Sequence, residues 1–151
     1  MEITGTISSV LSLKPNPGVV WSISPDETVF RAIELLSEKN VGALPVVEGE
    51  KIIGMLSERD YTRKVALHGK NSKETLVREI ISTNVITVTP QHSVEECLRL
   101  MTEHKIRHLP VIEDGKLIGI VSIGDLVNWI IKAQNHIIQQ MEDYIHGRYI
   151  A

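Results

Sequence analysis

Residues 44–60 read LPVVEGEKIIGMLSERD, and residues 109–125 read LPVIEDGKLIGIVSIGD. The second stretch repeats the first at an offset of 65 residues, and both contain a Gly-x-x-Ser-x-x-Asp pattern. The same offset aligns residues 20–65 with residues 85–130 without a gap. A gapless internal match of this length predicts that the two parts of the chain share one local fold.

Each copy opens with a short run of residues that favour a strand. These runs are Val19–Ile23 and Val85–Val88. Pro25 and Pro90 follow them, and proline ends a strand because it cannot donate to the ladder. The sequence therefore predicts one short strand at the start of each copy.

An amphipathic helix is predicted next in each copy. Thr28 and Ser93 stand at N-cap positions, and Glu96, three residues after Ser93, completes a capping box. Apolar residues then recur at the spacing of one helical face. They are Val29, Ala32, Ile33 and Leu36 in the first copy, and Val94, Cys97, Leu98 and Met101 in the second.

A hairpin and a second helix complete each copy. Gly49 and the pair Asp114-Gly115 are turn signals, and the second helix is predicted to start near Ser57 and near Ser122. The predicted hairpin strands are Ala43–Val47 with Ile52–Leu56, and His108–Ile112 with Leu117–Val121. Each copy is thus a β-α-β-β-α unit, and the fold class is α/β.

The length of each copy predicts how the two pack. A unit of about 60 residues buries too little surface to be more than marginally stable alone. We therefore expect the two units to place their sheets face to face by pseudo-two-fold symmetry and to share one core. We assign residues 7–67 to the first repeat, 75–132 to the second and 133–151 to a C-terminal helical extension, with the polar linker His68–Glu74 between the repeats.

The composition excludes several classes of function. A net charge of −3 argues against sequence-independent binding of nucleic acid, which needs a dense basic surface. No apolar run approaches the ~20 residues that cross a bilayer, and Met1–Val20 lacks the pattern of a signal peptide. We therefore expect a cytoplasmic protein without membrane or nucleic-acid partners. The single cysteine, Cys97, excludes an internal disulfide, and the six histidines show no metal-ligand spacing.

The repeated unit resembles the CBS (cystathionine-β-synthase) domain, because Leu-Pro-Val opens its hairpin and Gly-x-x-Ser-x-x-Asp closes it. Two such units resemble a tandem CBS pair, or Bateman module, and the resemblance extends from about Ile7 to Lys132. Residues 57–61 (SERDY) and the helical tail look like the stand-alone members of this family, which carry no attached enzyme, channel or transporter domain.

This resemblance implies regulation without catalysis. Such pairs commonly bind AMP, ADP, ATP or NAD in clefts between the repeats, and two pairs usually associate into a flat homodimer. We therefore expect a module without a catalytic cofactor that senses an adenine nucleotide and signals to a regulated protein of unknown identity. The alternative is an interaction module with empty clefts. The sequence offers no nucleophile–base pair and no Walker-type phosphate loop, so we do not expect an enzyme.

Ser57 with Asp60, and Ser122 with Asp125, are the central candidate residues. In the family, the matching hydroxyl faces phosphate and the matching carboxylate receives the ribose hydroxyls. The chemistry is suitable, because a carboxylate has two acceptor oxygens and a helix N-terminus attracts phosphate. The alternative is that Ser-x-x-Asp simply caps a helix, and the two roles do not exclude each other.

The stretch that opens the hairpin differs between the repeats. Gly42, Ala43 and Leu44 of the first repeat correspond to Arg107, His108 and Leu109 of the second. The family lines its clefts with this stretch, and arginine suits phosphate because its planar guanidinium makes bidentate hydrogen bonds. The alternative is a solvated strand end with two ordinary polar residues. We expect unequal clefts, with arginine-based phosphate recognition in the second.

Further candidates surround the two motifs. Arg59 and Arg63 lie near the start of the second helix, where Gly124 and Asn128 stand in the other repeat. Cations are unfavourable at a helix N-terminus, so a phosphate partner would explain the arginines, which are otherwise ordinary surface residues. The remaining candidates precede the first strands, in the family's adenine-side segment and its equivalent: Lys14, Thr83 and Asn84.

The chain after Asp125 reads as one long helix with an apolar stripe. The stripe contains Leu126, Ile130, Ala133, Ile137, Met141 and Ile145, and Val127, Ile131 and Ile138 broaden it. The positions beyond Ile130 have no obvious core of their own pair to cover. Because an exposed apolar patch usually marks an interface, we expect the tail to contribute to a homodimer. The alternative is a helix that folds back on its own pair.

Overall fold

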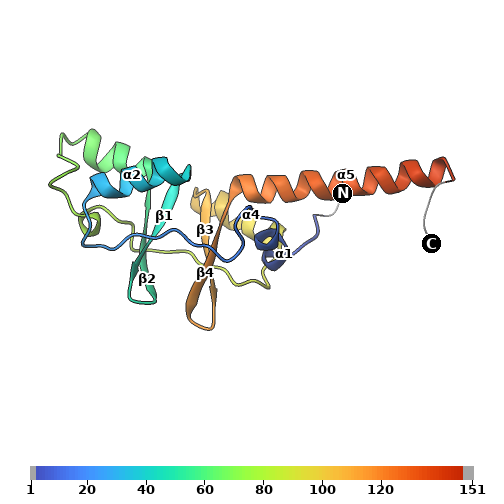
Figure 1. Ribbon diagram of the computed structural model, residues 1–151, viewed down its shortest axis with the longest axis horizontal. Helices are drawn as coiled ribbons and strands as arrows, with labels where there is room; N and C mark the ends of the chain where they lie inside the picture. The colour runs from blue at the N-terminus through green and yellow to red at the C-terminus, as the bar shows by residue number, and fades with distance from the viewer. Residues whose placement is uncertain (1–2, 148–151) are drawn as a thin grey trace. The chain divides into compact units, whose positions relative to one another are not determined.

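The computed structural model describes residues 3–147, and Figure 1 shows the order of their helices and strands. The described chain divides into two compact units. Unit 1 comprises residues 3–17, 90–109 and 121–147, and unit 2 comprises residues 18–89 and 110–120. Every helix within the described range is too short or too polar to span a membrane.

Two antiparallel hairpins form two small sheets. Their strands are β1 (Ala43–Glu48) with β2 (Lys51–Ser57), and β3 (His108–Glu113) with β4 (Lys116–Ser122). The predicted turn residues are confirmed, because Gly49, Asp114 and Gly115 have φ of +65°, +52° and +76°. These values lie in the left-handed region that tight hairpin turns require. The two predicted hairpins are therefore present at the predicted places.

The first strand of each repeat is shorter than predicted. Val19–Ile23 and Val85–Val88 each contribute only one isolated parallel bridge. In the first repeat, the amide of Ile23 donates to the carbonyl of Pro45 at 3.1 Å. Extending this ladder would need an N–H from Pro45 on one side or from Pro25 on the other, and proline has none. Prolines stand at the equivalent positions of the second repeat, so the same limit applies there.

The predicted amphipathic helices are present. They are α2 (Val29–Lys39) and α4 (Val94–His104). Thr28 and Ser93 cap them as predicted, and Ser93 forms the expected capping box with Glu96. The equivalent residues Ala32 and Cys97 are both completely buried. The helical spacing of the apolar residues therefore identified the buried faces correctly.

The second helices of the two repeats differ in length. In the first repeat, α3 (Glu58–Tyr61) continues as a π-helical turn, η1 (Thr62–Ala66). In the second, α5 (Ile123–Ile145) has 23 residues. The predicted C-terminal extension is thus the continuation of α5, and its last residues, 148–151, lie outside the described range.

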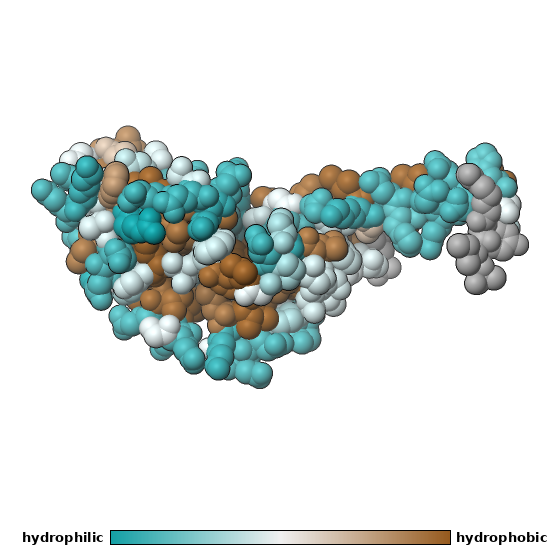
Figure 2. All heavy atoms as spheres, viewed as in Figure 1, coloured by the Kyte–Doolittle hydropathy of each residue, from teal (hydrophilic) through white to brown (hydrophobic). Residues whose placement is uncertain are grey.

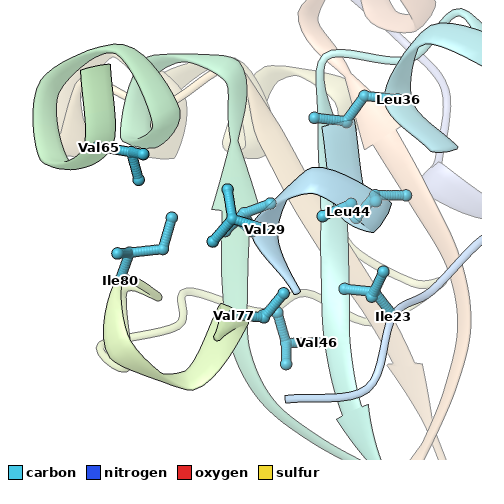
Figure 3. Packing of buried hydrophobic residues seen from close by; sticks show 10 residues of the cluster. Ile23, Val29, Leu36, Leu44, Val46, Val65, Val77 and Ile80 are labelled. Atoms are coloured by element: carbon cyan, nitrogen blue, oxygen red, sulfur yellow. The ribbon is translucent and has the colours of Figure 1, made fainter. Parts of the chain in front are cut away.

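Unit 2 has a core that α2, β1 and the short helix η2 (Val77–Glu79) build together, as Figure 3 shows. Its buried members are Ile23, Val29, Ala32, Leu36, Leu44, Val46, Leu56, Val65, Val77 and Ile80. Full burial of one valine or leucine contributes about 1.5–3 kcal/mol. The cluster therefore holds the first repeat together with residues 77–80 at the start of the second repeat.

Unit 1 contains a short N-terminal helix, α1 (Ile7–Ser12), and both α1 and α4 contact α5 (Figure 1). The sequence does not predict α1, because a helix of six residues is too short to show a periodic pattern. Ile7 and Val10 of α1 are buried, and the amide of Ile7 donates to the carbonyl of His92 at 2.9 Å. This packing fixes the loop that follows α1.

A short segment at the start of each repeat packs on the other repeat. Thr6 forms an antiparallel bridge with Ser93 in unit 1, and Leu76 forms one with Thr28 in unit 2. Ser93 and Thr28 are the equivalent N-caps of α4 and α2, so the two bridges occupy equivalent positions in the two repeats. The compact units therefore cut across the sequence repeats, and the repeat limits given above stay predictions.

Candidate functional site

The two Ser-x-x-Asp motifs form the same hydrogen-bonded cap. Ser57 Oγ accepts from the amide of Asp60 at 3.1 Å, and Asp60 Oδ2 accepts from the amide of Ser57 at 2.9 Å. Ser122 and Asp125 repeat these bonds with the same lengths. The capping interpretation is confirmed in both repeats, and the cap uses one oxygen of each carboxylate.

Unit 1 brings Lys14 and Asp125 together. Lys14 Nζ lies 3.0 Å from Asp125 Oδ2, and both side chains are partly exposed. A pocket opens beside this pair, between the loop after α1 and the first turns of α5. Its lining residues are Val10, Leu13, Lys14, Pro15, Asp125 and Asn128. The pocket thus combines apolar surface with a paired cation and anion.

Arg107 and His108 belong to the same charged group of unit 1. Burial lowers the pKa of His108, and the nearby charges of Lys14 and Arg107 lower it further, whereas Asp125 opposes the shift. The imidazole is therefore mainly neutral at pH 7. The carbonyl of Arg107 accepts from the amide of Ile123 at 2.9 Å, which fixes this backbone beside the start of α5. Arg107 is exposed.

Unit 2 holds the candidates around Asp60. The carbonyl of Gly42 accepts from the amide of Glu58 at 3.1 Å, which is the bond that Arg107 makes in the second repeat. Gly42 and its neighbour Ala43 bring no cation to this place. Arg59 and Arg63 are exposed on α3 and η1. The two repeats therefore share backbone geometry and differ in the charges beside it.

Lys64 is a residue of the Asp60 site that the sequence pattern misses. Its ammonium lies 3.1 Å from Asp60 Oδ1, donates to the carbonyl of Ile80 at 2.9 Å and lies 3.4 Å from Ser82 Oγ. The predicted residues Thr83 and Asn84 follow this segment and are exposed. The spacing of four residues from Asp60 was the available signal, since such pairs meet on a helix surface.

Three other candidate residues, Leu44, Leu109 and Gly124, could line a cleft only through their backbones or by leaving space. Leu44 and Leu109 are completely buried, so only their backbones could line a cleft. A Cβ on Gly124 would meet only Ser122 Oγ, at 3.6 Å, which is an ordinary contact. Packing therefore does not require glycine at this position, and its absence of a side chain leaves the first turn of α5 open.

The described residues contain no arrangement suited to metal or thiolate chemistry. Within residues 3–147, no three His, Cys, Asp or Glu side chains gather as metal ligands. Cys97 is buried on α4, and burial raises its thiol pKa to about 11. A reactive cysteine needs a lowered pKa and access to solvent, so Cys97 acts as a small core residue.

Comparison with known proteins identifies the family. The family model of the CBS domain matches residues 10–67 and 77–132. The chain belongs to the CBS-domain family. The resemblance seen in the repeated motifs and the tandem arrangement of two CBS repeats are thereby confirmed. CBS pairs are in general regulatory, nucleotide-sensing modules.

Several CBS-domain proteins match most of the chain. A CBS-domain protein structure from Burkholderia ambifaria MC40-6 is 47% identical with a TM-score of 0.83, covering 86% of this chain and 96% of that one. The mitochondrial CBS domain-containing protein CBSX3 of Arabidopsis thaliana is 40% identical over 152 residues, which are 95% of this chain and 73% of CBSX3. A hexameric CBS-CP12 protein from bloom-forming cyanobacteria is 29% identical with a TM-score of 0.72, covering 83% of this chain and 68% of that one.

Proposed function

We propose that the chain is a regulatory module that binds an adenine nucleotide at the pocket beside Asp125 and performs no reaction on it. The observation that carries this proposal is the grouping of Lys14, Arg107, His108 and Asp125 at the N-terminus of α5. The carboxylate offers acceptors to ribose hydroxyls. The two cations and the positive end of the helix favour a phosphate.

The ligand class follows from the mixed lining of the pocket. Val10, Leu13 and Pro15 offer apolar surface next to Lys14 and Asp125. A purine ring needs such apolar surface, whereas its ribose and phosphate need the polar groups. AMP, ADP, ATP and NAD share the adenosine phosphate that this combination would recognise.

A change in the Lys14–Asp125 pair would transmit occupancy. Ribose binding at Asp125 competes with or rearranges the ion pair, and Lys14 belongs to the loop that α1 anchors. A ligand that prefers one arrangement of this loop shifts the population toward it. The regulated protein would read that shift. In this proposal the module has no catalytic cofactor and works in the cytoplasm, although the relative CBSX3 is a mitochondrial protein.

Isothermal titration calorimetry of the full chain tests this function. AMP, ADP, ATP and NAD are titrated separately, with CMP as a control that keeps the ribose phosphate but changes the base. We expect micromolar to sub-millimolar dissociation constants for at least one adenine ligand, roughly −5 to −8 kcal/mol, and weaker binding of CMP. A folded protein that binds none of the four contradicts the proposal.

Assembly is a second candidate function, and the exposed apolar face of α5 favours it. Ile131, Ile138 and Ile145 follow each other at intervals of seven residues and are 51%, 52% and 74% exposed. In Figure 1, no helix or strand of unit 1 lies beside the distal half of α5, and Figure 2 shows apolar residues along it. The stripe is therefore not covered by folding back onto unit 1.

We propose that a second copy of the chain covers this face in an antiparallel orientation. A seven-residue apolar repeat is the pattern by which two helices pack along a seam. Lys132 lies in the first half of the stripe and Glu142 near its end. Antiparallel pairing brings these opposite charges together, whereas parallel pairing places each beside its own copy. A two-fold axis allows both copies to bury the same face.

A further inference from the structure

The Asp60 site of unit 2 is filled by a lysine from its own helix. An ammonium group has three N–H donors. The ammonium of Lys64 contacts three oxygens: Asp60 Oδ1 at 3.1 Å, the carbonyl of Ile80 at 2.9 Å and Ser82 Oγ at 3.4 Å. Every donor of this group therefore has an acceptor within the chain, without a ligand.

Residues 80–82, which carry two of the acceptors of Lys64, are held in place by backbone hydrogen bonds to β2. The amide and carbonyl of Met55 in β2 each form a 3.1 Å hydrogen bond with the carbonyl and amide of Ser82. Gly54 permits this close approach, because a Cβ there would lie 2.8 Å from Ile81 Cδ1 and 3.0 Å from the Ser82 carbonyl oxygen. The acceptors of Lys64 are thus on a segment that cannot easily withdraw.

The two carboxylates differ in what remains available. Asp60 Oδ2 accepts from the amide and the hydroxyl of Ser57, at 2.9 and 3.0 Å, while Oδ1 is occupied by Lys64. Asp125 Oδ2 takes both the amide of Ser122 and the ammonium of Lys14. The Asp125 side chain is 24% exposed compared with 15% for Asp60.

The position of Lys64 has a different occupant in the second repeat. The equivalent residue, 65 positions later, is Trp129. Its indole Nε1 donates to the carbonyl of Thr4 at 2.8 Å, and its ring would lie within 2.6 Å of a Cβ placed on Gly5. Trp129 therefore packs against the N-terminal segment and brings no cation to Asp125 from α5.

We infer that Lys64 closes the Asp60 site to nucleotides, so that each chain binds one nucleotide, at Asp125. This inference rests on the proposed function and adds the stoichiometry and the residue that sets it. A ribose diol at Asp60 would have to displace an ammonium whose other acceptors are fixed. At Asp125, the cap and Lys14 both contact Oδ2, so a diol has only the Lys14 pair to rearrange, and the side chain is more exposed than that of Asp60.

Calorimetry with AMP as the probe tests this inference on the full chain. We expect one AMP per chain for the unmodified protein and a second binding event in Lys64→Met, which keeps the length of the side chain without its charge. Lys51→Met removes an exposed lysine of β2 and serves as the matched control, with one AMP per chain. Circular dichroism verifies that each variant is folded.

The possible outcomes separate this inference from the proposed function. Two AMP molecules per unmodified chain contradict closure of the Asp60 site, whatever Lys64→Met does. A folded Lys64→Met that gains no second event, or that binds AMP more weakly, shows that Lys64 does not block the site. If Lys64→Met does not fold, the stoichiometry of the unmodified chain still decides. Absence of any AMP binding contradicts the proposed function itself.

Discussion

The same Ser-x-x-Asp cap begins α3 in the first repeat and α5 in the second, yet the two carboxylates have different surroundings. Beyond Asp60, Lys64 places its ammonium 3.1 Å from the carboxylate. Beyond Asp125, α5 continues and Trp129 stands at the equivalent position. The motif therefore determines the helix cap, and we propose that the residue four positions later determines which carboxylate a ligand can reach.

The largest effect is expected from the two aspartates themselves. Asp125→Asn keeps an oxygen for the cap but loses the charge and one acceptor. Charge-assisted hydrogen bonds contribute about 1.5–3 kcal/mol each, so AMP affinity should fall at least about a hundredfold when two ribose hydroxyls are affected. Asp60→Asn is the matched variant and should change AMP affinity less than about threefold, within a difference of ~0.7 kcal/mol.

Calorimetry on both variants measures this comparison. Equal losses for Asp125→Asn and Asp60→Asn would show that both sites take nucleotide. If Asp125→Asn binds AMP with unchanged affinity, the pocket of unit 1 is not the nucleotide site. Thermal unfolding of both variants is the control for damage to the caps.

The sequence predicted the shared features of the two sites better than their difference. A cap depends on residues three positions apart, so Ser57 with Asp60 and Ser122 with Asp125 were recognisable from local spacing. The closure of the Asp60 site also depends on Ile80 and Ser82, which lie 16 and 18 residues from Lys64. No local pattern reports such contacts, and the same holds for Lys14, which lies far in sequence from Asp125.

The same holds for the fold: its local features could be predicted from the sequence, and its long-range contacts could not. Helical faces and hairpin turns follow from local periodicity and from turn residues, and these predictions are confirmed. The first strands were predicted too long, because their length depends on Pro45 and its equivalent in the partner strand as well as on Pro25 and Pro90. The exchange of N-terminal segments between the repeats has no signature in either segment alone.

Arg107 offers the next sharpest difference between the sites, since its counterpart Gly42 has no side chain. Arg107→Ala should weaken AMP by about 1.5–3 kcal/mol through the loss of a charge-assisted hydrogen bond to phosphate. Adenosine, which lacks the phosphate, should bind nearly as before. Arg59→Ala, on α3 of the first repeat, is the control and should leave both affinities unchanged. Equal weakening of AMP and adenosine would show that Arg107 acts through packing.

The unequal lengths of α3 and α5 lead to a prediction about assembly. Ile138→Lys places a charge in the proposed apolar seam and should weaken the dimer at least about tenfold, or ~1.4 kcal/mol. Gln140→Lys adds the same charge to an exposed polar position of α5 and should have little effect. Sedimentation equilibrium measures both. Truncation after Lys132 removes most of the stripe and should give a monomer, whereas a truncated chain that dimerises as tightly excludes α5 from the interface.

The smallest effect concerns His108, whose counterpart Ala43 does not titrate. Because burial lowers the pKa of His108 in the folded chain, the unfolded chain takes up a proton first as the pH falls below the ordinary value of 6.5. The free energy of unfolding should therefore decrease below that pH, by at most ~1.4 kcal/mol for each further drop of one pH unit. Urea titrations of the unmodified chain and of His108→Asn between pH 7.5 and about 5 should differ in this slope. Identical slopes would show that the pKa of His108 is not lowered in the folded chain.

Native mass spectrometry with AMP tests the central claim most directly, because it counts ligands on each intact chain. The account predicts that the unmodified protein carries one AMP per chain and that Asp125→Asn carries none at the same concentration. Asp60→Asn should retain one AMP per chain. An unmodified chain that carries no AMP, or an Asp125→Asn variant that still carries one while Asp60→Asn carries none, would contradict nucleotide binding beside Asp125.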